Sequence, residues 1–239
     1  MRNYLVFNGH DSRDYGVYIS GEGTFSAPQK TVNFLAVPGK NGDLIGASSR
    51  FQNITVTYPA FIYSNFNENI RNFRSMLNSI NGYAELTDSY HADEFRLAAY
   101  ADEFEPKVQP KNDAGAFDIV FNCKPQRFLV SGKNSTTYTA TSFTVTNPTL
   151  FPSKPILEVY VPSGNSGIFS IGSQSITVNN PGGTTIIDCE MQDCYYGSTN
   201  LNKFVTFSNY KFPELKPGIN NIALTSGMSI KIQGNWWWL

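Results

Sequence analysis

The sequence predicts a mainly β protein of two domains, an α+β domain over residues 1–132 and an all-β domain over residues 133–239. Charged residues make up only 15% of the 239 residues and aromatic residues 14%. Neutral polar residues that alternate with aromatic and β-branched ones are typical of strands and turns. Only one segment has a helical period. A small, polar stretch at 131–142 predicts the boundary between the domains.

Four runs in the N-terminal half are predicted to be extended. Short strands are expected at 4–7 and 15–20, with a turn between them. Residues 30–37 form another extended run, and residues 51–63 alternate between apolar and polar side chains. That alternation is typical of a strand with one buried face. These strands are expected to form the sheet or barrel-like part of the first domain.

The stretch VPGKNGDL, residues 37–44, lies between two of these strands and predicts the tip of a hairpin. Asn41-Gly42 is a strong signal for a tight turn in which both residues take positive φ values. Gly39-Lys40 does not make a phosphate loop, because no Ser or Thr follows the lysine and strands flank it. We therefore interpret the stretch as a structural hairpin tip and not as a catalytic or phosphate-binding loop.

One amphipathic helix is predicted over residues 66–80, with an apolar stripe that faces the sheet. The stripe is Ile70, Phe73, Leu77 and Ile80. Ser64 or Asn65 is expected to cap the start of the helix, and Asn81-Gly82 to end it.

Further strands are predicted at 83–89, 95–104 and 116–125. In the second half, short strands follow at intervals of about 8–12 residues, the spacing of a β-sandwich or jelly roll. They are residues 142–146, 155–161, 167–172, 174–180, 184–190, 203–208, 221–226 and 229–234.

Charge and apolar content exclude several classes of protein. The net charge is −1 and no basic stripe is visible, which argues against nucleic-acid binding. No run approaches the roughly 18 apolar residues of a membrane span. The apolar run at 4–7 is too short for a signal peptide, so we expect a soluble protein made in the cytosol. An odd number of cysteines (Cys123, Cys189 and Cys194) predicts free buried thiols.

No pattern predicts an enzyme, a metal or a cofactor. His10 and His91 lie in polar turns, and no nucleophile motif accompanies them. Asp188, Glu190 and Asp193 lack the spacing of a calcium loop or zinc site, and we interpret them as a solvated face. The sequence leaves open a carboxylate pair for glycoside hydrolysis among its 19 acidic residues, but no spacing singles one out.

The chain ends in three consecutive tryptophans, Trp236 to Trp238. Neighbours on a strand face opposite sides, so the core takes either Trp236 and Trp238 or Trp237 alone. An exposed Trp237, together with Tyr195 and Tyr196, would offer aromatic faces to a sugar or a protein partner.

Several motifs together resemble the distal tail proteins of long-tailed phages, the siphophage tail family. The N-terminal YLVFNGHDSRDYGVYISG resembles that family's opening strand and "D-x-x-x-Y-G" turn, and VPGKNGDL resembles its "P-G-[RK]-N-G-D-L" motif. The helix end followed by GYAELTD, and the strand AFDIVFNCKPQRFLVSG, also fit. In the second half, Asn147-Pro148-Thr149, IIDCEMQDCYY and FPELKPGINNI recur in the family's order, so the resemblance covers nearly the whole chain.

The resemblance implies a structural protein at the distal end of the phage tail in the virion. The first domain would form a homohexameric ring around the channel through which DNA leaves, and a projecting hairpin would clasp the neighbouring subunit. The implied interface residues of this hairpin are Pro38, Gly39, Lys40, Asn41, Gly42 and Asp43. The second domain would be a galectin-like sandwich, and no cofactor is implied.

The partners implied are the tail tube protein, a tail-associated or tip protein and a receptor-binding protein. An alternative is a carbohydrate-binding adhesin that recognises host cell-wall polysaccharide through Tyr195, Tyr196 and Trp237. A third option, a peptidoglycan-cleaving tail enzyme, lacks any nucleophile, metal or acid-pair signature.

Overall fold

The computed structural model describes residues 2–21, 23–46, 50–103, 105–109, 113–162, 166–179 and 183–239. The ends of two predicted strands, at residues 104 and 180, lie outside the described residues. The chain divides into two compact units, one up to Arg127 and one over Phe128–Trp238. Strands dominate both units and one α-helix is present in the described residues, so the mainly β prediction is confirmed.

The N-terminal unit is built on an antiparallel sheet in the order β2-β1-β7-β8-β10-β6-β3, with β9 paired to β10. Its strands are β1 Leu5–Phe7, β2 His10–Asp11, β3 Tyr18–Ile19, β6 Ile54–Ile62, β7 Ala84–Asp88, β8 Glu94–Tyr100, β9 Lys107–Gln109 and β10 Ala114–Leu129. Alternate residues of β6 are buried, as the sequence pattern predicts. Two further strands, β4 Asn33–Leu35 and β5 Leu44–Gly46, form a separate pair.

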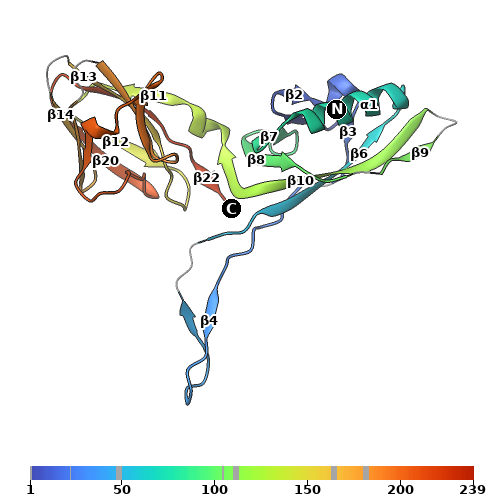
Figure 1. Cartoon of the computed structure of the whole chain (residues 1–239), viewed down its shortest axis with the longest axis horizontal. Helices are drawn as coiled ribbons and strands as arrows, with labels where there is room; N and C mark the ends of the chain where they lie inside the picture. The colour runs from blue at the N-terminus through green and yellow to red at the C-terminus, as the bar shows by residue number, and fades with distance from the viewer. Residues whose placement is uncertain are drawn as a thin grey trace. The chain divides into compact units, whose positions relative to one another are not determined.

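The helix α1, Phe66–Ser79, covers one face of this sheet (Figure 1). Phe73 and Leu77 of the predicted stripe are fully buried, and Met76 joins them. The 3₁₀ helix η1, Ser12–Tyr15, packs beside α1, where the Tyr15 and Phe73 rings meet edge to face at 5.8 Å.

The predicted N-terminal cap of α1 is wrong. Asn65 takes the left-handed conformation with φ 51°, and its side chain makes no capping hydrogen bond. Instead, the amide of Phe66 donates to Oδ1 of Asp113, at 3.1 Å. The orphan amide of the first turn is thus satisfied by a residue far along the chain.

Two antiparallel sheets pack face to face in the C-terminal unit, in the orders β11-β21-β13-β16-β17-β18 and β12-β20-β14-β15-β19. Buried residues from both sheets form one core, so this unit is a β-sandwich. Its strands are β11 Ser135–Tyr138, β12 Ser142–Asn147, β13 Ile156–Val161, β14 Gly167–Ile171, β15 Gln174–Val178, β16 Gly183–Asp188, β17 Asp193–Tyr196, β18 Thr199–Asn200, β19 Val205–Phe207, β20 Gly218–Leu224, β21 Ser229–Gln233 and β22 Trp237–Trp238. Two 3₁₀ helices complete it, η3 Val130–Lys133 and η4 Asn202–Phe204.

Candidate assembly arm and neighbouring sites

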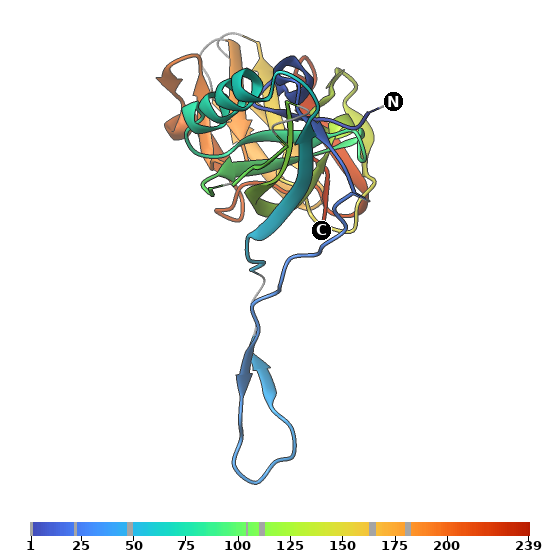
Figure 2. The same ribbon diagram turned by 90° about the vertical axis from the view of Figure 1, so that its right-hand side faces the viewer.

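Residues 29–52 form a long hairpin, called here the arm, of which 47–49 lie outside the described residues. At its base, the amide of Thr31 donates to the carbonyl of Arg50, and that of Gln52 to the carbonyl of Gln29, each at 2.9 Å. Farther out, β4 and β5 pair antiparallel. The arm extends away from the sheet of the N-terminal unit in both Figure 1 and Figure 2.

Both faces of the arm are apolar and exposed. Phe34 pairs with Ile45 and Leu35 with Leu44. Because successive side chains point to opposite sides, the first pair lies on one face and the second pair on the other. Their exposed fractions are 64%, 71%, 57% and 48% in that order. A lone two-stranded hairpin is only marginally stable in water, and an exposed apolar surface of this kind is a candidate interaction surface.

The tip differs from the predicted tight turn. Asn41 does not take a positive φ, whereas Gly39 and Gly42 do, with φ 77° and 81°. The amide of Lys40 donates to the carbonyl of Val37 at 3.1 Å. Proline followed by a positive-φ glycine at the two central positions is typical of a type II turn.

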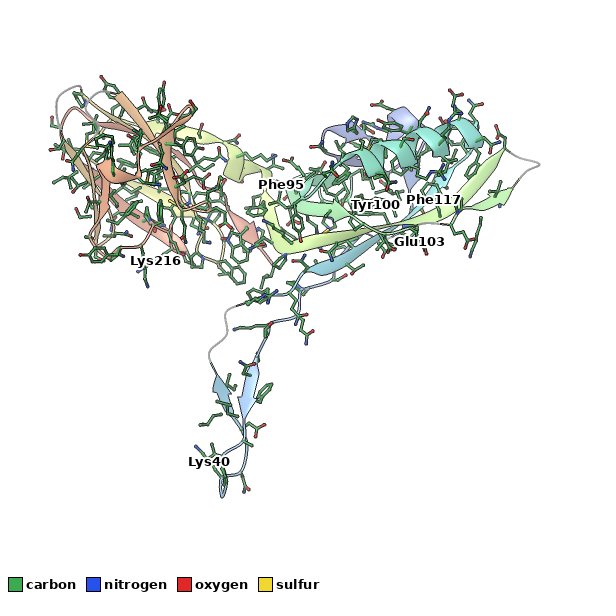
Figure 3. All side chains as sticks on the ribbon, in the orientation of Figure 1. Lys40, Phe95, Tyr100, Glu103, Phe117 and Lys216 are labelled. Atoms are coloured by element: carbon green, nitrogen blue, oxygen red, sulfur yellow. The ribbon has the colours of Figure 1, made fainter. Side chains whose placement is uncertain are left out.

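The residues from Pro38 to Asp43 all lie on the loop between β4 and β5 and are exposed. Figure 3 places Lys40 at the far end of the arm. The subunit-interface role of these six residues stays a prediction.

A buried polar cluster contacts Thr24, in the segment that precedes the arm. The Arg127 guanidinium donates to the carbonyl oxygen of Thr24 and, at 3.1 Å, to Glu94. The Tyr58 hydroxyl donates to Asp88 at 2.7 Å. Burial, and next the Asp88 carboxylate, raise the pKa of Tyr58 well above its usual value. The segment leading into the arm is therefore fixed to the sheet by charged and polar groups.

Arg96 is the unexplained member of this cluster. Its side chain is 5% exposed, and its two terminal nitrogens have no hydrogen-bond partner among the described residues. Burial, and next the charge of Arg127, lower the pKa of Arg96.

The two histidines lie in separate polar settings. His10, on β2, has Nδ1 3.2 Å from the Tyr15 hydroxyl. His91 has Nδ1 3.3 Å from Asp88, and its ring contacts that of Phe25. Among the described residues, these partners include no serine or cysteine nucleophile.

The three cysteines are free and buried, as predicted. Burial raises the pKa of Cys123 to about 11 and that of Cys194 to about 12, so both thiols stay protonated and unreactive at neutral pH.

The solvated acidic face predicted around two of the cysteines is only partly correct. Asp188 is 7% exposed, and its Oδ1 accepts hydrogen bonds from the amides of Glu190 and Met191. Glu190 is exposed and pairs with Lys154 at 3.0 Å. No group of His, Cys, Asp and Glu in the described ranges could hold a metal ion.

The aromatic contact residues predicted from sequence are not brought together by any ring contact or hydrogen bond within the described residues. Tyr196 is 56% exposed, and Tyr195 is half-buried. Trp237 stacks on Phe151 with ring centroids 4.4 Å apart, and its Nε1 donates to the Pro152 carbonyl at 3.0 Å. Its ring is thus already engaged within the sandwich.

A groove of about 810 Å³ lies instead at another place on the same unit, lined in part by the 209–217 segment. Sequence reasoning missed it, because its residues come from separate loops and no motif connects them.

No helix in the described residues is long and apolar enough to cross a membrane.

Two solved structures, a hub adsorption protein of one phage and a chain of the baseplate of another, share the fold of this chain. The Dit (gp 19.1) protein of SPP1, a paradigm of the hub adsorption apparatus in phages that infect Gram-positive bacteria, matches with a TM-score of 0.77 and 16% identity over 100% of each chain. A chain of the phage p2 baseplate, in its activated conformation with Sr, matches with a TM-score of 0.57 and 13% identity over 97% of each chain.

The chain thus has the Dit fold over its full length, and the resemblance predicted from its motifs is confirmed at the level of the fold. No protein-family model matches the sequence, and no curated protein matches it.

Proposed function

We propose that this protein is a structural component of a phage virion, a distal tail protein that forms the hub of the baseplate. The observation that carries the proposal is the match in fold to the SPP1 hub protein over 100% of both chains. Fold does not by itself imply function, so the proposal also needs a site that suits the role. The arm provides one, since its two apolar faces lack a partner within the described chain.

In the proposed assembly, the subunits form a homohexameric ring around a channel for DNA exit. The arm of each subunit packs against the next subunit, which is a head-to-tail contact that closes into a ring. Burial of Phe34 and Ile45 on one face and of Leu35 and Leu44 on the other removes exposed apolar surface from water. The tail tube protein, a tip protein and a receptor-binding protein are the proposed neighbours in the tail.

The experiment is native mass spectrometry of the purified protein, with negative-stain images. We expect a six-fold multiple of 26.6 kDa and ring-shaped particles. The double variant Phe34→Ser with Ile45→Ser should lose the hexamer. Its thermal stability as a monomer should stay unchanged, because exposed side chains contribute little to folding. Val108→Ser, at another half-exposed apolar position of the N-terminal unit, is the matched control.

A second variant tests the tip separately. Asn41→Pro with Gly42→Val should weaken the hexamer if the tip contacts the neighbour, because φ 81° at Gly42 is unfavourable for valine. Hexamers that persist in both double variants would show that the arm is not the subunit interface.

A further inference from the structure

The groove of the C-terminal unit has the size and the construction of a ligand site. Its volume of about 810 Å³ is within the range of small-molecule sites, roughly 300–1,000 Å³. Its walls come from the turn between β14 and β15, from the 209–217 segment and from the start of β20. Lys216, on one of these walls, is labelled in Figure 3.

Amide side chains hold both walls in place. On one wall, Nε2 of Gln174 donates to Oδ1 of Asn209 at 2.8 Å and to the carbonyl of Lys211 at 2.6 Å. On the other wall, Asn220 accepts from the amide of Lys216 at 2.9 Å and donates back to its carbonyl at 2.8 Å. The backbone that carries both lysines is therefore fixed before any ligand arrives, which lowers the entropy lost on binding.

Tyr210, one of the lining residues, lies in a turn after β19 in which its amide donates to the carbonyl of Phe207 at 3.1 Å. Its side chain is 95% exposed, and its backbone has φ 57°. Positive φ at a bulky residue is uncommon and occurs mainly in turns. The turn accounts for this conformation, and it leaves the aromatic ring of Tyr210 exposed at the groove.

The charges of the lining favour an acidic ligand. Among the described residues, the groove is lined by Lys154, Lys211 and Lys216 and by a single carboxylate, that of Glu214. Lys154 is already paired with Glu190, at 3.0 Å. The other two lysines outnumber Glu214 and leave an excess of positive charge. Cys189, also in the lining, is buried, so its thiol is not presented to a ligand as a nucleophile.

We propose that this groove binds a saccharide that carries an acidic substituent, a phosphate or a carboxylate. Tyr210 packs against the apolar C–H face of a sugar ring. The amides and backbone groups of the two walls hydrogen-bond to its hydroxyls, and Lys211 and Lys216 pair with the acidic group. The site differs from the one predicted from sequence at Tyr195, Tyr196 and Trp237, and it does not depend on ring formation.

The test measures binding to the full chain in two ways: a glycan array with neutral, phosphorylated and uronic-acid saccharides, and saturation-transfer NMR. The NMR probes are N-acetylglucosamine 6-phosphate and its neutral parent, N-acetylglucosamine. We expect the phosphorylated probe to bind at least about tenfold more tightly at low salt, because exposed charge pairs are screened by salt.

The variant Tyr210→Asn removes the ring and keeps a residue that tolerates positive φ. It should reduce binding about tenfold or more, with unchanged thermal stability and unchanged native mass. Lys211→Ala with Lys216→Ala should abolish the preference for the phosphorylated probe. Tyr160→Ala, at an exposed tyrosine outside the groove, is the control.

No binding to any glycan on the array or to either probe would overturn the proposal. So would binding that Tyr210→Asn leaves unchanged. A monomeric protein that still binds the phosphorylated probe would contradict the proposed ring and not the groove.

Discussion

Asn147 is predicted to be the most sensitive polar residue of the C-terminal unit. It is 2% exposed and makes four hydrogen bonds. Its Nδ2 donates to the carbonyls of Phe151 and Leu215, at 2.9 and 3.0 Å. Its Oδ1 accepts from the amide and the hydroxyl of Thr149, at 2.9 and 2.8 Å. At about 0.5–1.5 kcal/mol for each of the four bonds, Asn147→Ala should lower the free energy of unfolding by about 2–6 kcal/mol.

The isosteric change Asn147→Asp sharpens the test. It keeps the acceptor for Thr149 but turns a carboxylate oxygen toward two carbonyl oxygens, in a place that water does not reach. Burial raises the pKa of such a carboxyl, so the charged form weakens the folded state. This loss is small below the unfolded pKa of about 3.9 and grows as the pH rises above it. At pH 7, Asn147→Asp should be at least as unstable as Asn147→Ala, and it should recover at pH 4.

The assay is urea unfolding followed by tryptophan fluorescence. All three tryptophans are in the last four residues, so the signal reports on the C-terminal unit. Asn221→Ala, at an exposed position of the neighbouring strand β20, is the control and should change stability by less than about 0.5 kcal/mol. A loss below about 1 kcal/mol in Asn147→Ala, or an Asn147→Asp variant as stable as the wild type at pH 7, would refute the reasoning.

Three other outcomes are expected. Asp113→Ala should cost about 1 kcal/mol of stability through the lost helix cap, measured by circular dichroism, whereas Asp118→Ala on exposed β10 surface should not. Raising the pH from about 9 to 11 should destabilise the N-terminal unit, because the Cys123 thiol ionises at lower pH in the unfolded chain than in the folded one. The contribution of the protonated thiol to stability is complete below pH 9 and is lost as the pH rises towards 11. Cys123→Ala should reduce this pH dependence. Gly132→Ala should lower the free energy of unfolding by about 1–3 kcal/mol and shift the tryptophan emission, because a Cβ there would lie 2.6 Å from the backbone nitrogen of Trp236. A melting curve identical to that of the wild type would contradict this close packing.

Local patterns were predictable and long-range partners were not. The helix was expected over residues 66–80 and lies over Phe66–Ser79. It was predictable because apolar residues at helical spacing in the local sequence mark the face that will be buried. Its cap comes from Asp113, which no window around residue 66 contains. At the arm tip, Asn41-Gly42 predicted a two-residue turn, but Pro38-Gly39 forms its own turn within the same loop.

For the candidate sites too, local features could be predicted from the sequence and long-range contacts could not. From sequence alone, Phe34 and Leu35 are indistinguishable from residues of a strand that packs on a core. The structure shows that the described residues leave both faces of the arm exposed. The motif Asn147-Pro148-Thr149 was recognisable by resemblance, whereas its four hydrogen bonds depend on the distant Leu215. The groove could not be predicted, because separate loops meet there only in the folded unit.

The exposed apolar side chains on both faces of the arm also have a consequence for the order of assembly. In the proposed ring, a closed circle has one more interface than an open row of the same subunits. The last contact forms within one particle, at a high effective concentration, so it loses little translational freedom. Partly built rows would therefore convert to closed circles or fall apart, and they would be scarcely populated. In a closed ring, every arm would pack against a neighbouring subunit, and the exposed Phe34 and Ile45 of each arm would be covered. No free arm would then remain to add further subunits and extend the particle into a filament.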